Sequence, residues 1–444
     1  GRFYGFEYTS DGLMTAEDEP KGNRFEHLFD ANGRLTDSTD QEGGHWQFSR
    51  SAFANGDILS ETLTGEGNRT SYLDFTHSTE AYTSTITGPT GAETLFNRSA
   101  DGLRVTKVLP CGMDLELKYG VDSEYKYKYL KEITRTSPAG LAQITINSRS
   151  YEDTNSDDIP DLITDTVTVN GKSWTSADNT LAGMITNASP LGRVTTVEYN
   201  TTNLLTEETG VTGLLPTTFS FDARGRLTGT TTGTRTTTRG YDANGNLDFI
   251  VTPDNKTYDY TFDVMGRLTQ EERPEGVSLG YGYDDNGNMT LLVTPKSVSH
   301  TFDYTGHNLR KEYATPLSGS YLYVSDKERK LKSLTFPSGS QIVNTYTNGL
   351  LTETLTPENS IDFTYGCATL LSGVSMGSES ATYTYDGSLL ETDSRSGILN
   401  QIVSYTYDNN HRVASITYAG SNYLLGYDND SLLTSIGSFT ITRN

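Results

Sequence analysis

An acidic segment in the first half of the chain has the oxygen spacing of a calcium-binding loop. Residues 153–161 read Asp-Thr-Asn-Ser-Asp-Asp-Ile-Pro-Asp, which places side-chain oxygens at positions 1, 3, 5 and 9. The predicted ligands are Asp153, Asn155, Asp157, Ile159 through its carbonyl, and Asp161. Position 6 lacks the usual glycine, and Ca²⁺ prefers about six to eight oxygens, so water or another carboxylate has to complete the site. A solvated acidic turn is the alternative interpretation.

Histidine is the other residue type that could do chemistry. Six histidines occur, and none forms an HxH or HExxH pair or a cluster with cysteine. His45 lies in a glycine-rich aromatic stretch, and His300 and His307 flank one predicted turn, where a glycan-active enzyme could use such a residue as general acid and base. Ordinary surface or strand histidines are the alternative. No nucleophile-elbow, P-loop or dinucleotide motif occurs, so the sequence favours a non-catalytic protein.

Charge and cysteine content limit the class of partner. The 444 residues carry 34 Lys and Arg against 57 Asp and Glu, a net charge of −23. This field repels phosphate backbones, so we expect no nucleic-acid partner. The sequence lacks an apolar run of about 18 residues and therefore predicts no transmembrane segment. The two cysteines, Cys111 and Cys367, have no CxxC spacing, and the simplest interpretation is two buried free thiols.

An internal repeat predicts the strands and turns that position the candidate residues. A unit of the form aromatic-Asp-x-x-Gly-x-Leu/Met recurs, with a second series of prolines about half a repeat later. Its copies begin at Phe29, Phe221, Tyr241, Phe262, Tyr283 and Phe302, with eroded copies at Tyr346, Tyr365, Tyr385, Tyr407 and Tyr427. The prolines are Pro253, Pro274, Pro295, Pro316, Pro337 and Pro357.

Each repeat of about 21 residues therefore holds two turns separated by strand-length segments. Residues 257–262 alternate polar and apolar, which indicates a β-strand with one face half-buried. We predict that Asp242, Asp263 and Asp284 accept backbone N–H bonds across their turns, where glycine supplies a positive φ. With 43 Gly, 28 Tyr and 16 Phe, the composition is typical of a folded all-β chain.

The repeat also resembles a known family. Residues 241–247 read Tyr-Asp-Ala-Asn-Gly-Asn-Leu, and closely similar stretches occupy 262–269 and 283–290. In-phase copies of this kind resemble the RHS or YD-repeat family. The resemblance implies a sheet of consecutive hairpins wound as a spiral that encloses a cavity or tube. It also implies roles such as a shell around a toxic domain in bacterial RHS effectors and toxin complexes, or adhesion in teneurin-like surface proteins.

These observations together predict an all-β fold, an elongated spiral or shell of consecutive antiparallel β-hairpins. Residues 1–195 form a divergent YD-repeat region that contains the possible calcium loop at 153–161, and residues 196–444 form the regular β-spiral. Segments 1–8 and 437–442 both alternate like strands and could act as complementary sheet edges in self-association.

The predicted function is a non-catalytic structural scaffold, a shell or fibre subunit, outside the cell or on a bacterial cell surface. Two alternatives stay open: a fragment of an RHS shell that encapsulates a toxin, and a carbohydrate-active enzyme, a polysaccharide lyase or hydrolase, on a YD-repeat scaffold. The expected partners are other copies or other repeats of a longer chain, with a glycan or an encapsulated polypeptide as further candidates. Ca²⁺ is the one predicted cofactor.

Overall fold

The computed structural model describes residues 3–77, 81–367 and 369–442. In this part of the chain it holds 41 strands, two short 3-10 helices and no α-helix. The strands of the first half are β1 (Gly5–Tyr8), β2 (Met14–Asp18), β3 (Arg24–Phe29), β4 (Leu35–Thr39), β5 (His45–Ala52), β6 (Ile58–Thr64), β7 (Arg69–Thr76), β8 (Tyr82–Thr87), β9 (Glu93–Arg98), β10 (Arg104–Val108), β11 (Asp114–Val121), β12 (Lys128–Thr136), β13 (Ala142–Glu152), β14 (Leu162–Val169), β15 (Lys172–Asn179), β16 (Met184–Ala188), β17 (Val194–Tyr199), β18 (Thr206–Val211), β19 (Thr217–Phe221), β20 (Leu227–Thr232) and β21 (Arg235–Tyr241).

The second half continues in the same way. Its strands are β22 (Leu247–Val251), β23 (Thr257–Phe262), β24 (Leu268–Arg273), β25 (Val277–Tyr283), β26 (Met289–Val293), β27 (Ser299–Tyr304), β28 (Arg310–Ala314), β29 (Ser320–Ser325), β30 (Leu331–Thr335), β31 (Gln341–Thr347), β32 (Leu350–Leu355), β33 (Ser360–Gly366), β34 (Leu370–Met376), β35 (Glu379–Asp386), β36 (Leu389–Ser396), β37 (Gln401–Tyr407), β38 (Val413–Tyr418), β39 (Ser421–Tyr427), β40 (Leu433–Ile436) and β41 (Phe439–Thr440). The 3-10 helices are η1 (Pro110–Gly112) and η2 (Pro274–Gly276).

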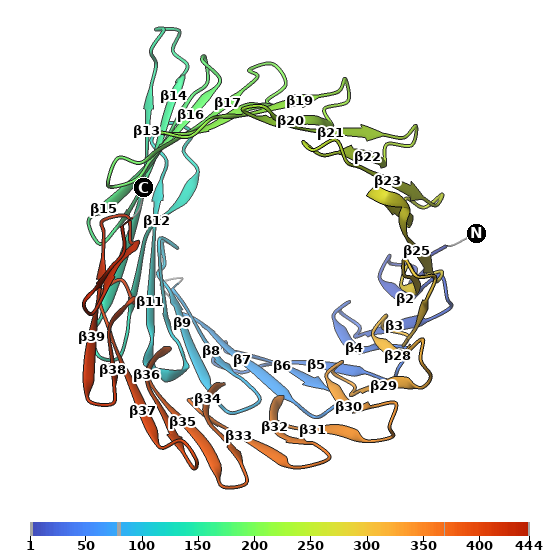
Figure 1. The fold of residues 1–444 in the computed structure, drawn as a ribbon. Coiled ribbons are helices and arrows are strands. Elements are labelled where there is room, and N and C mark those ends of the chain that lie inside the picture. The colour runs from blue at the N-terminus through green and yellow to red at the C-terminus, as the bar shows by residue number, and fades with distance from the viewer. Residues whose placement is uncertain (1–2, 78–80, 368, 443–444) are drawn as a thin grey trace. The chain divides into compact units, whose positions relative to one another are not determined.

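The strands fall into two compact units. Unit 1 contains residues 1–96, 260–383 and 395–400, and unit 2 contains 97–259, 384–394 and 401–444. In unit 1 strands pair antiparallel with their neighbours in the chain, as β25 does with β24 and β26. Unit 2 follows the same rule, as β14 does with β13 and β15 (Figure 1). The prediction of an all-β fold of consecutive antiparallel hairpins is confirmed.

The Asp-x-x-Gly turns have the predicted backbone geometry. After β23, the N–H of Asp263 donates to the carbonyl of Arg267 at 2.9 Å, and the N–H of Gly266 donates back to the Asp263 carbonyl at 3.0 Å. Gly266 has a φ of 75°, a conformation that costs glycine no steric strain. In β25 the register shifts between Gly282 and Tyr283, so the aromatic residue that starts a repeat lies at a β-bulge.

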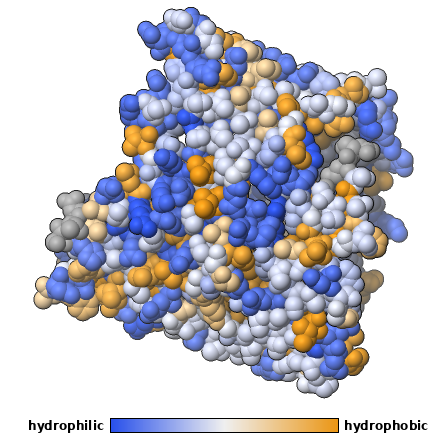
Figure 2. All heavy atoms as spheres, turned by 90° about the vertical axis from the view of Figure 1, so that its left-hand side faces the viewer, coloured by the Kyte–Doolittle hydropathy of each residue, from blue (hydrophilic) through white to orange (hydrophobic). Residues whose placement is uncertain are grey.

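The sheet surfaces are half-buried. Strand β23 alternates exposed and half-buried residues along its length, as its period-2 pattern predicts. Among the described residues the buried hydrophobic side chains are only Ala16, Val105 and Met113. Figure 2 shows apolar residues scattered among polar ones on the face it presents. Stability in such a chain comes mainly from contacts between neighbouring hairpins, as in other repeat proteins.

The cysteines depart from the sequence interpretation. Cys111 and Cys367 are disulfide-bonded and neither is a free thiol. Two facts explain the error: the residues are far apart in the sequence, and spacing alone carries no information about which strands meet. The division at residue 195 concerns repeat regularity and stays a prediction. Of the two predicted sheet edges, residues 1–2 lie outside the described residues.

Candidate functional site

The predicted calcium ligands lie in the loop between β13 and β14. Asp161 is 3% exposed, and its carboxylate accepts the Thr154 hydroxyl at 2.6 Å together with the backbone N–H groups of Thr154 and Asn155. Asp153 accepts backbone N–H groups from inside the loop, the shortest from Ser156 at 2.6 Å. Burial raises the pKa of Asp153, but these backbone bonds together outweigh it and hold the pKa below its ordinary value.

The remaining predicted ligands are on the solvent side of the loop. Asp157 accepts the N–H of Ile159 at 2.9 Å and the Asn155 side-chain amide at 3.1 Å, and the Ile159 side chain is 64% exposed. The described residues contain no group of three or more His, Cys, Asp or Glu side chains arranged to hold a metal ion. This arrangement therefore fits a self-satisfied acidic loop, and calcium binding stays a prediction from the sequence.

Two of the singled-out histidines bond to neighbouring strands. His45 Nε2 lies 3.0 Å from Asp37 Oδ1, and His300 Nδ1 lies 2.7 Å from the Tyr313 hydroxyl. The His300 and Tyr313 rings are stacked, with an interplanar angle of 9°. The pKa of Asp37 is lowered by hydrogen bonding, with the Thr36 side chain the largest contributor. Each of these histidines is held by one side chain on an adjacent strand.

His307 occupies a different environment, between two turns of unit 1. Its Nε2 lies 2.5 Å from Asp40 Oδ2, and the two side chains are 4% and 0% exposed. The contact is an ion pair only when His307 is protonated. Asp40 Oδ1 accepts the N–H of Gly44 at 2.7 Å, and Gln41 Nε2 donates to the Gly306 carbonyl at 2.7 Å. Together, the contacts of Asp40 with His307 and of Gln41 with Gly306 hold the two turns against each other.

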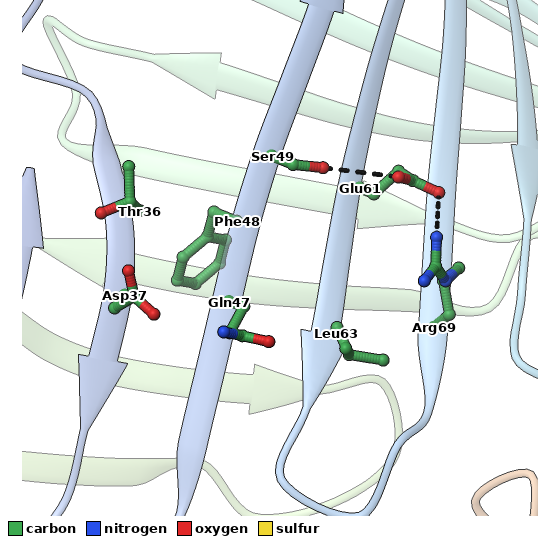
Figure 3. Close-up of a pocket in the computed structure, with 8 residues that line it drawn as sticks. All are labelled: Thr36, Asp37, Gln47, Phe48, Ser49, Glu61, Leu63 and Arg69. Atoms are coloured by element: carbon green, nitrogen blue, oxygen red, sulfur yellow. Dashed lines mark hydrogen bonds and ion pairs between the residues drawn. The ribbon is translucent and has the colours of Figure 1, made fainter. Parts of the chain in front are cut away.

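A small cavity lies on the face of β4 to β7 (Figure 3). Its volume is about 300 Å³. Both carboxylate oxygens of Glu61 are engaged there: Arg69 Nη1 donates at 2.7 Å and the Ser49 hydroxyl donates at 3.4 Å. Phe48 lies in the same cavity beside these polar groups. Both acids that line the cavity are paired with a basic side chain, Glu61 with Arg69 and Asp37 with His45, as in structural cross-strand contacts.

The Asp of each regular repeat bonds within its own turn. Asp263 Oδ1 accepts the N–H groups of Met265 at 2.9 Å and Arg267 at 3.0 Å, and Oδ2 accepts Arg267 Nε at 2.8 Å. These bonds, with the Arg267 side chain first, lower the pKa of Asp263. Equivalent bonds occur at two further turns, between Asp242 and Asn246 and between Asp284 and Asn288. The prediction that the three aspartates accept backbone N–H bonds across their turns is confirmed.

Tyrosine at the start of a repeat bonds to the preceding repeat. The Tyr283 hydroxyl donates to the Leu268 carbonyl at 2.8 Å, and the Arg267 guanidinium lies 4.7 Å from the centre of the Tyr283 ring. The same donation recurs along the chain, from Tyr241 to Leu227, Tyr304 to Met289, Tyr346 to Leu331, Tyr365 to Leu351, Tyr407 to Leu390 and Tyr427 to Val413. These tyrosine hydroxyls therefore tie their hairpins to the hairpins before them.

In unit 1, turns far apart in the sequence dock on one another. The backbone N–H of Lys21 donates to Asn286 Oδ1 at 3.0 Å, and Lys21 Nζ lies 3.1 Å from Asp284 Oδ2. Further along both segments, the N–H of Lys327 donates to Glu66 Oε1 at 2.9 Å. Turns from the first 96 residues thus contact turns from residues 260–383. The contacts follow the same order along both segments, with Lys21 on Asn286 and then Glu66 on Lys327.

Unit 2 contains the same kind of docking within itself. The carboxylate of Asp386 accepts the Ser137 hydroxyl and the backbone N–H two residues further on, the latter at 2.9 Å. Asp430 is held in the same way by the Ser189 hydroxyl at 2.7 Å and the Leu191 N–H at 2.9 Å. In each case a Ser-Pro-x-Gly turn binds the carboxylate of a repeat turn. The two docked turns of unit 2 therefore share one binding arrangement, in which a serine hydroxyl and a backbone N–H donate to the same carboxylate.

A family model agrees with the repeat geometry. The model described as Teneurin YD-shell matches residues 1–444. The chain belongs to the Teneurin YD-shell family. No curated protein matches this YD-shell chain significantly. Among the described residues, none of the helices combines the length and apolar character needed to cross a bilayer.

Solved structures similar to this YD shell include parts of toxin complexes. The crystal structure of TcdB2-TccC3-Cdc42 matches with a TM-score of 0.45 and 11% identity, covering 95% of this chain and 28% of that one. A Photorhabdus luminescens Tc holotoxin pore with a mutated TccC3 matches with a TM-score of 0.44 and 11% identity, covering 93% of this chain and 22% of that one. The YD-shell chain thus spans less than a third of the length of these solved chains.

Sequence reasoning missed two features of this YD shell. The repeat period predicted the Asp-x-x-Gly turns, but the bonds from the repeat tyrosines to carbonyls of the preceding hairpin depend on how adjacent hairpins stack. Docking between turns joins residues more than 200 positions apart, such as Lys21 and Asn286. The Ser-Pro-x-Gly stretches at 137–140 and 189–192 were the available signal, because they place a hydroxyl and a free N–H on one turn.

Proposed function

We propose that this YD-shell chain is a non-catalytic structural scaffold that works outside the cell. The observation that carries the proposal is the use made of its polar side chains. Repeat tyrosines and aspartates, the residues most able to do acid–base chemistry here, hold hairpins and turns together, as Tyr283 and Asp263 do. A catalytic carboxylate or phenol has to stay available for substrate. These groups instead form hydrogen bonds with backbone N–H and carbonyl groups.

The extracellular part of the proposal is supported by the cysteines and the charge. Both cysteines are disulfide-bonded, and disulfides persist mainly in oxidising compartments such as the cell exterior. A net charge of −23 favours a soluble surface and repels nucleic acids. Both features suit a shell exposed to the medium.

Surface labelling of intact source cells tests the location. An antibody raised against the folded chain should label intact cells or recover the protein from the medium. Labelling only after the cells are permeabilised would overturn the extracellular assignment.

Incubation of the purified chain with acidic polysaccharides and with peptides tests the absence of catalysis. We expect no release of unsaturated or reducing sugar ends and no peptide products. Product release that disappears in a His300→Ala variant of unchanged melting temperature would instead support the carbohydrate-active alternative. Encapsulation of a toxic polypeptide stays a prediction from the family resemblance, and co-purification of a protease-protected polypeptide with the chain would support it.

A further inference from the structure

One docked pair of turns in unit 1 shows how two repeat turns recognise each other. The receiving turn, residues 19–22, has a proline, then Lys21, then a residue with positive φ. Lys21 gives its backbone N–H to Asn286 Oδ1 at 3.0 Å and its Nζ to Asp284 Oδ2 at 3.1 Å. Asn286 in return donates to Glu19 Oε2 at 2.8 Å. Asp284 and Asn286 of the inserted turn thus bond to Lys21 and Glu19 of the receiving turn.

The inserted turn has a near-duplicate whose tip, Ala243 and Asn244, is exposed. Residues 241–246 read Tyr-Asp-Ala-Asn-Gly-Asn, against Tyr-Asp-Asp-Asn-Gly-Asn at 283–288. Asp242 Oδ1 accepts the Asn246 N–H at 2.8 Å, the same bond and distance as between Asp284 and Asn288. Asn244 stands where Asn286 stands, is exposed, and makes no side-chain hydrogen bond within the part of the chain that the structure describes.

The receiving turn also has an exposed counterpart, at residues 294–297. Its sequence is Thr-Pro-Lys-Ser, with Lys296 in the place of Lys21. The N–H of Thr294 donates to Val298 O at 2.9 Å and the N–H of Ser297 donates to Thr294 O at 2.9 Å, the bonds that also close the 19–22 turn. Ser297 has a φ of 57°. Lys296 is exposed and has no ion pair or hydrogen bond to any described residue.

We propose that the 242–246 turn of a second copy of this chain docks on the 294–297 turn. Asn244 Oδ1 then accepts the Lys296 N–H, and the Asp242 carboxylate pairs with Lys296 Nζ, repeating the established contact between Lys21 and the Asp284 turn. Thr294 replaces Glu19, so the contact lacks one hydrogen bond and is weaker than the one inside the chain. Since the two surfaces differ, the contact is heterologous and links copies head to tail.

Sedimentation of the full 444-residue chain over a concentration series tests the proposal. The wild type should self-associate, and Lys296→Glu and Asn244→Ala should each weaken the apparent association by about tenfold or more, the equivalent of about 1.4 kcal/mol. Lys131→Glu is the matched control, because it makes the same charge change at an exposed strand position. It should associate like the wild type.

A mixing experiment separates docking from a general charge effect. Lys296→Glu keeps an intact 242–246 turn, and Asn244→Ala keeps an intact 294–297 turn. At a concentration at which neither variant associates alone, an equimolar mixture should therefore form a dimer that does not grow further. A monomeric wild type at every concentration, or a mixture that stays monomeric while the wild type associates, would overturn the proposal. If Lys296→Glu fails to fold, Lys296→Gln replaces it in both experiments.

Discussion

The hydroxyl of Tyr283 donates to the carbonyl of Leu268 at 2.8 Å, and the arginine beside that leucine, Arg267, covers the tyrosine ring. Tyr283→Phe keeps the ring and removes only the bond. We expect a loss of about 1 kcal/mol of unfolding free energy, the net worth of one hydrogen bond, measured by urea denaturation. Tyr258→Phe is the control, since its hydroxyl has no hydrogen bond to a described residue. Equal losses in both variants would show that the bond contributes nothing.

Removal of a turn carboxylate should destabilise the chain more than removal of a strand carboxylate. Asp263→Ala leaves the N–H groups of Met265 and Arg267 without their acceptor, so its melting temperature should fall. Asp248→Ala makes the same charge change at an exposed position in β22 and should melt like the wild type. Indistinguishable melting of the two variants would contradict the turn-stabilising role.

Acid should weaken the fold through the same turns. Burial raises the pKa of Asp408, but bonds from Arg412 outweigh it, so the folded-state pKa lies below the ordinary value. A carboxylate of this kind contributes stability that is present above the unfolded pKa of about 3.9 and is lost as pH falls through the folded pKa. Asp284 is shifted in the same direction.

Urea denaturation between pH 7 and pH 3 measures this loss. The unfolding free energy should decline below about pH 4, and Asp408→Asn should be less stable than the wild type at pH 7 while losing less on acidification. A free energy that stays constant down to pH 3 would exclude the mechanism.

The acidic loop between β13 and β14 should depend on one carboxylate more than on the others. Asp161 is buried and binds Thr154 and Asn155, so Asp161→Ala should cost about 1–3 kcal/mol, the penalty for buried groups left unsatisfied. Asp157→Ala removes a carboxylate from the solvent side of the loop and should cost less. A reversed order in chemical denaturation would contradict this account of the loop.

Calcium binding by the same loop has a separate measurement. If Asp153, Asn155, Asp157, the Ile159 carbonyl and Asp161 bind Ca²⁺, the melting temperature rises when calcium replaces chelator, by mass action on the folded state. The increment should vanish in Asp157→Ala. Identical melting of the wild type in calcium and in chelator would refute the site.

The sequence predicted the local structure because that structure depends on neighbours in the chain. The strand at 257–262 and the turns at Asp242, Asp263 and Asp284 follow from alternation and from Asp and Gly at fixed offsets. What escaped prediction depends on how hairpins stack: the Tyr283 bond to Leu268, the contact of His307 with Asp40, and the disulfide-bonded state of the cysteines. A single sequence records residue types and spacing, and it does not record which distant turns meet.

The docking of Lys21 on Asn286 also has a consequence during synthesis. The hairpin that carries Lys21 completes its own backbone bonds early, but its docking partner is 265 residues further along the chain. At roughly 5–20 residues per second, the ribosome supplies that partner about 13–50 s later. Throughout that interval the early turns present unpaired lysine and N–H groups to other chains on the same polysome. Dense translation therefore favours exchange of turns between nascent copies, and slow or sparse translation favours closure within one chain.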